Sequence, residues 1–265
     1  MDTLLDLYSD YLISSFGQTS ATGLATLLQG GISHDQVSRF LASRPRTSPD
    51  LWMIVKPFAR RIQSDEGVMI VDYSISEKPY TDENDIVCWH YDHSHQRIVK
   101  GINFITALYY SQGVSLPVGF ALVAKTEHCV DKKDGKEKRR SPITKNEYYR
   151  QLLEQAVQNQ IPFSYVLNDV WYSAAENMRF IQYTLGKDFI MPIKSNRKVA
   201  LSLADKHQGR YVSVDTLDLE ANVPVTIYLE SVDFPMLLVK QVFANEDGTF
   251  GGHSLSGDQR YHAFL

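Results

Sequence analysis

Residues 67–75 have the sequence GVMIVDYSI, and this stretch decides the fold that the chain predicts. The run from Val68 to Val71 is apolar and largely β-branched, which is typical of a buried strand in a central sheet. Asp72 interrupts that run. A carboxylate within a buried strand is costly unless a metal or another cation accompanies it. The pattern therefore predicts a central strand that carries a functional aspartate.

A second aspartate has a comparable setting further along the chain. Asp169 follows the apolar stretch 165–167 and precedes a predicted helix. Side chains at the carboxyl ends of strands in an α/β sheet usually line a site. Two carboxylates on neighbouring strands can hold divalent ions about 4 Å apart for attack on a phosphodiester. We therefore interpret Asp72 and Asp169 as catalytic residues and metal ligands, although either alone also fits a structural aspartate at a strand end.

The segments around these aspartates alternate between strand and helix patterns. Strands are predicted over 102–110 and 117–125, joined by a Ser-Gln-Gly turn, and again over 164–167 and 189–193. Amphipathic helices are predicted over 148–157 and 174–184, an exposed polar loop over 126–143, and a β-rich insertion over about 205–245. This alternation predicts an α/β fold with a mixed sheet and flanking helices, over residues 66–265.

The first 65 residues predict a small all-α domain that precedes the sheet. Ser33 is placed as the N-cap of a short helix, with Gln36 at the capping-box position. A Gly-Gly-Ile turn joins this helix to the one before it, which indicates a helix-turn-helix candidate. His34, Gln36, Ser38 and Arg39 would then face DNA. A plain helical hairpin explains the same pattern.

The composition is that of an ordinary globular chain. Of 265 residues, 43% are hydrophobic and 22% charged, and the net charge of -4 argues against binding nucleic acid by bulk charge. No apolar run approaches the roughly 20 residues that a membrane helix needs, and no export signal is visible at the start. Two cysteines fit a reducing cytoplasm, where we expect the protein.

Several stretches together resemble the catalytic domain of DDE-type insertion-sequence transposases. Around the first aspartate these are EKPY (77–80), WHYDHS (89–94) and VKGIN (99–103). Around the second they are LNDVWY (167–172), ENM (176–178) and FIMPIKSNR (189–197). The resemblance runs from about residue 50 to 260. It implies a ribonuclease-H-like core with a β-rich insertion before the last catalytic residue.

The resemblance also implies a function and its partners. Members of this family use two Asp and one Glu to hold Mg²⁺ (or Mn²⁺) for strand cleavage and strand transfer at transposon ends. Asp72 matches the first acid and Asp169 the second. We accordingly expect a bacterial transposase that acts on double-stranded DNA at terminal repeats, as a homodimer, in the cytoplasm and at the nucleoid.

The third acid has no match in this sequence. In the family it lies on a helix after the insertion, and that helix is expected to start at Leu255–Gln259 here. No Arg-Trp and no Glu follow, and Glu246 precedes the required place. Because the third carboxylate helps to hold the second metal, we expect a chain cut short before it to be inactive and to expose an apolar face.

Local clusters of cations are the remaining sign of DNA binding. One lies between Lys125 and Arg150 and a second between Lys187 and Arg210, and such clusters supply most non-specific affinity for DNA. Lys194, Arg197 and Lys198 belong to the second cluster. By the resemblance, Tyr91, His93 and Lys100 border the active site and contact DNA phosphates. A solvated charged face explains either cluster alone.

Other readings of the same residues stay open. Cys88, His90, Asp92, His93 and His95 include enough ligands for zinc, although their spacing fits no common zinc motif. A non-catalytic DNA-binding remnant that occupies transposon ends is the main alternative function. A two-carboxylate metal-dependent nuclease is a weaker one. There is no phosphate-binding Gly-rich loop, so we expect no nucleotide cofactor, and we expect no membrane partner.

Overall fold

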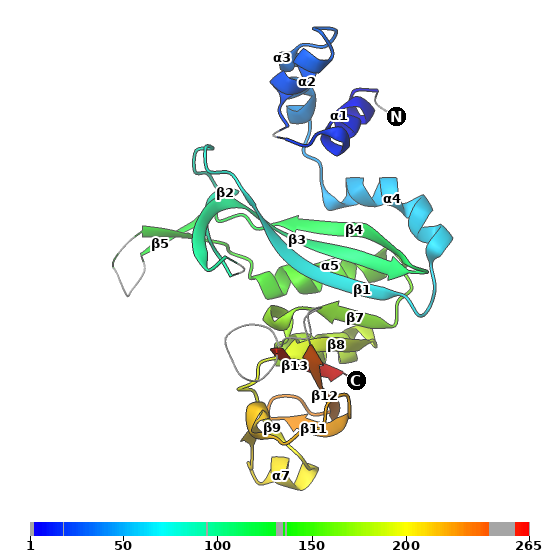
Figure 1. The fold of residues 1–265 in the computed structure, drawn as a ribbon, viewed down its shortest axis with the longest axis vertical. Coiled ribbons are helices and arrows are strands. Elements are labelled where there is room, and N and C mark those ends of the chain that lie inside the picture. The colour runs from blue at the N-terminus through cyan, green and yellow to red at the C-terminus, as the bar shows by residue number, and fades with distance from the viewer. Residues whose placement is uncertain are drawn as a thin grey trace. The chain divides into compact units, whose positions relative to one another are not determined.

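The computed structural model describes residues 3–17, 19–93, 95–130, 135, 137–243 and 258–264 (Figure 1). The chain divides into two compact units, residues 1–47 and residues 48–265. The sequence placed this boundary at residue 65. Helix α4 (Ser48–Ile62) belongs to the second unit, because its first residue, Ser48, forms two hydrogen bonds with other residues of that unit. Its hydroxyl accepts a hydrogen bond from the Phe120 amide (3.1 Å) and donates one to Oε1 of Gln155 (3.0 Å).

The first unit is a small group of three helices, α1 (Thr3–Ser14), α2 (Ala21–Leu27) and α3 (His34–Ala42). Tyr11, Leu24 and Val37 form its core. The predicted capping box is confirmed: the Gln36 amide donates to Ser33 Oγ (3.2 Å), and the Ser33 amide donates to Gln36 Oε1 (2.8 Å). The four residues expected to face DNA are all exposed on α3, and their contact with DNA stays a prediction.

The second unit is built on a mixed sheet centred on β1 (Val68–Glu77). On one side β1 pairs antiparallel with the long strand β3 (Arg97–Ser111), which also pairs with β2 (Val87–Asp92) and β4 (Val114–Leu122). On the other side β1 pairs in parallel with β7 (Tyr165–Asn168), and β7 with β8 (Asp188–Ile193). The resulting order β4-β3-β1-β7-β8 confirms the predicted ribonuclease-H-like sheet.

The turn between β3 and β4 confirms the predicted hairpin. Gln112 and Gly113 both have positive φ, 51° and 78°. That is the conformation that a tight two-residue hairpin requires, and a glycine adopts it without strain.

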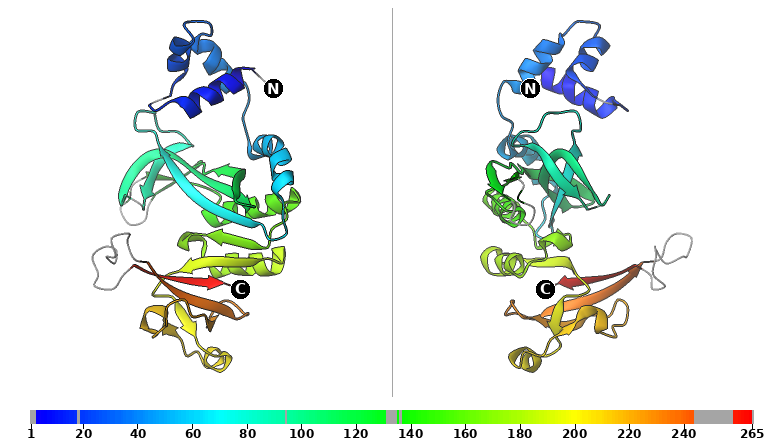
Figure 2. Two further views of the ribbon diagram at one scale, coloured as in Figure 1. Left: turned by 45° about the vertical axis from the view of Figure 1, so that its right-hand side comes forward. Right: turned by 90° about the vertical axis from the view of Figure 1, so that its left-hand side faces the viewer.

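Helices cover one face of this sheet. The right-hand view of Figure 2 shows α5 (Lys145–Gln158) and the helix α6 (Ala175–Arg179) on the same side of the strands. A π-helical turn, η2 (Phe180–Leu185), continues α6. The large buried side chains on this side include Met69, Tyr109, Tyr149 and Leu153, from the strands and from α5, and Phe163, which precedes β7. The other face carries half-buried and exposed residues.

The β-rich segment is present and continues the central sheet. It comprises β9 (Lys198–Ala200), a short helix α7 (Leu203–His207), β10 (Val212–Ser213), a 3₁₀ turn η3 (Val214–Thr216), β11 (Val225–Leu229) and β12 (Met236–Phe243). Strand β13 (Asp258–Phe264) joins it to the core by pairing antiparallel with both β12 and β8. The expectation of a helix starting at Leu255–Gln259 was therefore wrong for Asp258 and Gln259, whose backbone pairs with Phe243 and Val242 of β12. Residues 244–257, including Glu246, lie outside the described residues.

The polar segment 126–143 also differs from the prediction of a loop. It contains a two-stranded hairpin, β5 (Glu127–Val130) and β6 (Glu137–Arg140). A cross-strand ion pair between Arg140 and Glu127 (2.9 Å) supports it, an interaction that hydrophobic patterning does not detect. Among the described helices, none combines the length and apolarity needed to span a membrane.

Candidate active site

The two aspartates lie at the same level on neighbouring parallel strands. Val71 of β1 is the register partner of Asn168, the last residue of β7, so Asp72 and Asp169 are each one residue beyond this pair. Because side chains alternate along extended backbone, Asp72 lies on the face of β1 opposite to Met69 and Val71, and Asp169 directly follows the carboxyl end of β7. Asp72 is exposed there, whereas the sequence predicted a buried carboxylate. The reason is that helices bury only one face of β1 fully, through Met69 and Val71.

The two carboxylates interact unfavourably with each other. Burial raises the pKa of Asp169, and the charge of Asp72 raises it further, against the lowering effect of nearby backbone amides. Asp169 Oδ1 accepts a hydrogen bond from the Trp171 amide (2.9 Å) at the start of the 3₁₀ turn η1 (Val170–Tyr172). Asp72 Oδ1 accepts one from the Tyr73 amide (2.7 Å). A cation between the carboxylates would relieve their repulsion, so the pair suits a divalent metal.

Lys145 supplies a positive charge next to this pair. It is the first residue of α5, and its Nζ lies 3.7 Å from the centre of the Tyr73 ring. Burial lowers the pKa of Lys145 to about 8, while the Asp169 charge acts in the opposite direction. The sequence counted Lys145 only as one cation of a basic run. Nothing local marked it, because its place beside Asp169 depends on how α5 packs on the sheet.

A buried polar pair holds the end of β7 in place. Tyr149 of α5 donates a hydrogen bond from its hydroxyl to Oδ1 of Asn168 (2.8 Å). Its ring is stacked on Tyr172, with centroids 4.7 Å apart. The Asn168 amide in turn donates to the carbonyl of Asp169 (2.7 Å). This chain of contacts fixes the backbone that presents the second carboxylate.

The described residues supply two of the ligands that a metal needs. No group of three or more His, Cys, Asp or Glu side chains within the described ranges is placed to hold a metal ion. The predicted zinc ligands are among those searched: Cys88 and His90 point into the protein, and Trp89 and Tyr91 outward, as alternation along β2 predicts. Metal binding at Asp72 and Asp169 thus stays a prediction that their geometry and charge support.

The structure brings several of the predicted DNA-contacting residues together beside Asp169. The Tyr91 and His93 rings are 4.7 Å apart, the His93 and Trp171 rings 4.5 Å apart, and Lys194 lies over the Trp171 ring at 5.9 Å. Lys194 and Trp171 also line a cavity of about 330 Å³ with Arg197. The sequence missed Trp171, although a tryptophan two positions after a predicted catalytic aspartate was a signal in the sequence.

The remaining predicted contacts lie elsewhere. Lys100 is placed against Trp89, with its Nζ 5.8 Å from the ring centre. Lys198 begins β9 and lines a second cavity shared with Lys194 and Arg197. Arg39 belongs to the first unit. Their contact with DNA stays a prediction.

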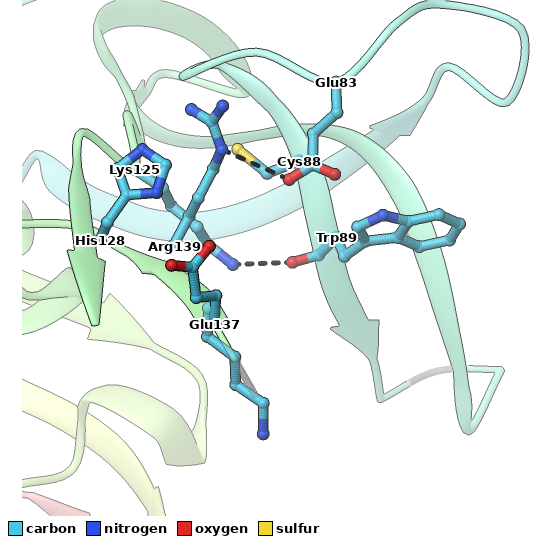
Figure 3. A pocket seen from close by; sticks show the side chains of 8 residues that line it. Glu83, Cys88, Trp89, Lys125, His128, Glu137 and Arg139 are labelled. Atoms are coloured by element: carbon cyan, nitrogen blue, oxygen red, sulfur yellow. Dashed lines mark hydrogen bonds and ion pairs between the residues drawn. The ribbon is translucent and has the colours of Figure 1, made fainter. Parts of the chain in front are cut away.

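A larger cavity of about 570 Å³ lies between β2 and the β5–β6 hairpin (Figure 3). The Lys125 amino group donates to the carbonyl of Trp89 (2.7 Å) across it. Arg139 forms ion pairs with Asp85 (2.5 Å) and Glu83 (3.5 Å). Burial raises the pKa of the Cys88 thiol, which disfavours the thiolate that a nucleophile or zinc ligand needs. Neither Asp72 nor Asp169 lines this cavity. We therefore place the candidate active site at the two carboxylates and not in this cavity.

An apolar hollow of about 570 Å³ adjoins the strand that ends at Asp169. Its walls include Leu167, Ile190, Val239 and Phe264, from four adjacent strands. Leu167 is the register partner of Ile70, which is two residues before Asp72 on β1, so the hollow is on the face that bears Asp72. The sequence predicted an exposed apolar face, and that expectation stays a prediction.

Comparison with known proteins identifies a family model that matches most of the chain. A family model described as DDE superfamily endonuclease matches residues 2–211. No curated protein matches.

Two solved structures are similar over about 70% of this chain, each at 13% identity. The Drosophila P element transposase strand transfer complex has a TM-score of 0.34 and is covered over 37% of its chain. The Mos1 transposase paired-end complex with left transposon end has a TM-score of 0.21 and is covered over 57%. The chain thus spans between about a third and three fifths of these transposases.

Proposed function

The chain belongs to the DDE superfamily of endonucleases, and from this premise we propose that it is the transposase of a bacterial insertion sequence. Its reaction would be metal-dependent strand cleavage and strand transfer at the terminal repeats of double-stranded DNA. The observation that carries the proposal is the placement of Asp72 and Asp169 side by side on neighbouring parallel strands. We also propose that it acts in the cytoplasm, as a homodimer on paired ends.

The carboxylates would hold Mg²⁺ or Mn²⁺ in this reaction. The raised pKa of Asp169 and the part that Asp72 plays in it support this, because a divalent ion offsets that repulsion. The metal, when bound, activates the attacking oxygen and stabilises the charge that develops on the phosphodiester. Asp169 is oriented for this task by the Trp171 amide, and Lys145 adds positive charge beside it.

DNA would approach the edge of the sheet at which β7 and β8 end, beside Asp169. Lys194 and Arg197 line a cavity there together with Trp171, and Lys198 lies nearby on β9. Phosphate contacts from such side chains position the backbone without reading its sequence. The proposal assigns these residues to backbone binding next to the cleaved bond.

A second candidate function is non-catalytic binding of transposon ends. It is favoured by one observation: within the described residues, no third His, Cys, Asp or Glu joins the pair. Two-metal chemistry on two carboxylates alone should lose most of its rate. We therefore expect this 265-residue chain to bind DNA under conditions in which its rate of cleavage is very low.

Nicking of supercoiled plasmid in Mn²⁺ separates these functions. Wild type is compared with Asp72→Asn, Asp169→Asn and, as a matched control, Asp188→Asn. Asp188 is a half-buried aspartate at the amino end of β8, where it lies far along the strand from the carboxylate pair. Slow nicking that is lost in the first two variants and kept in the third supports the transposase assignment.

The other outcomes are equally definite. Binding with no nicking in wild type favours the end-binding function. Nicking that Asp72→Asn and Asp169→Asn retain contradicts the proposed active site, and failure to bind any DNA contradicts both functions.

A further inference from the structure

Lys145 lies beside both strands that carry the carboxylate pair. It is the first residue of α5, and Tyr149 is four residues later, on the same face of the helix. The Tyr149 hydroxyl bonds Oδ1 of Asn168, the last residue of β7, at 2.8 Å. The Lys145 Nζ is 3.7 Å from the centre of the ring of Tyr73, the residue after Asp72 on β1. One side chain is thus close to the carboxyl end of β7 and to the functional position of β1.

The Lys145 ammonium is half-buried and has no bound anion. Within the described residues it forms no ion pair, and its contact is with the face of the Tyr73 ring. Burial lowers the pKa of Lys145 to about 8, and the negative charge of Asp169 acts in the opposite direction. The side chain is therefore largely protonated at neutral pH. An ammonium in such a place is costly to desolvate, and a ring face offsets only part of that cost.

The charges of Lys145 and Asp169 influence each other. Burial raises the pKa of Asp169, and the positive charge of Lys145 is among the influences that lower it. This interaction acts over a distance longer than an ion pair. Lys145 thus neutralises part of the negative charge of the pair without taking a carboxylate oxygen as its partner, so those oxygens stay available to a metal ion.

The formal charges determine how many divalent ions this site favours. Asp72 and Asp169 carry two negative charges, and Lys145 carries one positive charge. One divalent ion would leave an excess of one positive charge, and two ions would leave an excess of three. Like charges close together in a partly buried site repel strongly. Among the described residues, no third Asp, Glu, His or Cys is placed to offset this excess.

We propose that Lys145 restricts the Asp72–Asp169 pair to a single divalent ion, because its ammonium supplies positive charge that a second ion would otherwise bring. This inference rests on the proposed function, in which the pair holds Mg²⁺ or Mn²⁺. It adds the number of ions and the residue that sets this number. Lys145 acts through the charge of Asp169 and is therefore a positioning residue.

Mn²⁺ binding to the full chain tests the inference without a measurement of activity. Electron paramagnetic resonance measures free Mn²⁺ during a titration at pH 7, and the ions of the site are those lost in Asp72→Asn and Asp169→Asn. We expect one such ion per wild-type chain. Lys145→Met removes a charge that repels the ion, so the variant should bind that ion at least about fivefold more tightly. Lys145→Arg keeps the charge and should bind Mn²⁺ as wild type does.

Lys145→Glu tests the restriction to one ion directly. This substitution replaces the ammonium by a third carboxylate beside the pair. The variant should bind two Mn²⁺ ions at the site, and their proximity should give the resonance spectrum of a spin-coupled pair, which wild type should lack. Circular dichroism confirms that each variant is folded, and Lys145→Met decides if Lys145→Glu is not.

Lys125→Met is the matched control. Lys125 is also half-buried, and burial lowers its pKa as well. Its amino group, however, donates to the carbonyl of Trp89 at 2.7 Å in the cavity shown in Figure 3. The charges that act on Lys125 are those of Cys88 and Glu83. Lys125→Met should therefore keep the wild-type affinity for Mn²⁺.

Two site ions per wild-type chain, or a Mn²⁺ affinity of Lys145→Met that is unchanged or weaker, overturns the inference and leaves the proposed function intact. An equal gain of affinity in Lys125→Met also overturns it, because the effect would then come from the net charge of the protein. Absence of a wild-type ion that depends on Asp72 and Asp169 overturns the metal-dependent function and the inference together.

Discussion

Tyr149 and Tyr172 are stacked with their ring centroids 4.7 Å apart and their planes 16° apart, and both are buried. Only Tyr149 uses its hydroxyl, to bond Asn168 at 2.8 Å. Within the described residues, the Tyr172 hydroxyl has no hydrogen-bond partner. Two similar side chains in one environment thus differ in a single interaction, and that interaction supports the strand end that presents Asp169.

This difference predicts opposite effects of the same substitution. Tyr149→Phe should lower the free energy of unfolding by about 1–3 kcal/mol, because it leaves the buried Asn168 oxygen unsatisfied. Tyr172→Phe should be neutral or stabilising, since it removes a buried hydroxyl without a partner. Urea unfolding of the two variants measures both values. Equal destabilisation would contradict the hydrogen-bond assignment.

Asp169→Asn should stabilise the metal-free protein at neutral pH. The folded-state pKa of Asp169 is raised above its unfolded value, mainly by burial and then by Asp72. The folded state therefore binds more protons between those two pKa values, and stability falls as pH rises through that window. The free energy of unfolding of Asp169→Asn should exceed that of wild type by the largest amount at pH 7, and this difference should disappear as pH falls to about 4.

Asp169→Ala is the control for this effect. Alanine also removes the charge, but it loses the oxygen that accepts the Trp171 amide, so it should be about 1 kcal/mol less stable than Asp169→Asn. Thermal unfolding across this pH range measures both. An Asp169→Asn variant that is less stable than wild type at pH 7 would show that the negative charge of Asp169 does not destabilise the folded state.

Gly101 should tolerate no side chain. A Cβ at Gly101 would lie 2.4 Å from the carbonyl oxygen of Ser76 and about 3.0 Å from the Glu77 backbone, where β3 pairs with β1. Because the backbone atoms of a paired strand cannot move without loss of hydrogen bonds, Gly101→Ala should lower the free energy of unfolding by about 2–4 kcal/mol or disturb this pairing.

Gly119→Ala is the comparison, since its Cβ would meet side-chain atoms of Leu152, Ser48 and Gln155, rather than backbone, at 3.2–3.4 Å. Gly119→Ala should lower the free energy of unfolding clearly less than Gly101→Ala does. Denaturant unfolding measures the free energy of unfolding of both variants. A Gly101→Ala variant as stable as wild type would contradict the strand register.

The cations beside Trp171 should contribute to DNA affinity through phosphate contacts. Replacing either Lys194 or Arg197 by alanine should weaken binding to all sequences and reduce the slope of log K against log salt by about 1. Lys56→Ala, an exposed lysine on α4, is the control and should leave the slope unchanged. Fluorescence anisotropy at several salt concentrations gives the slopes. An unchanged slope in both variants would place the DNA elsewhere.

The sequence predicted the central strands and the carboxylate pair because these depend on local patterns. The apolar run at 68–71, the Ser-Gln-Gly turn and the capping box at Ser33 are each specified within a few residues, and each is present. Asp72 was misjudged because an apolar run does not tell whether one or both faces of a strand are covered.

The residues that the sequence missed depend on contacts between distant segments. Lys145 reaches Tyr73 only because α5 packs on the sheet, and Trp171 meets His93 only because β7 and β2 lie in one sheet. The β5–β6 hairpin was missed for a different reason. Its strands are linked by an ion pair between Arg140 and Glu127, which hydrophobic periodicity does not reveal.

Mapping of bound Fe²⁺ tests the central claim most directly, that Asp72 and Asp169 together hold a divalent metal. Fe²⁺ replaces Mg²⁺ in oxygen-ligand sites, and with ascorbate and peroxide it cuts the polypeptide backbone close to where it is bound. We predict fragments that end near residues 72 and 169 in wild type and in Asp188→Asn. They should be suppressed by excess Mg²⁺ and absent from Asp72→Asn and Asp169→Asn. Cleavage elsewhere, or cleavage near both residues that survives these two substitutions, would contradict the account.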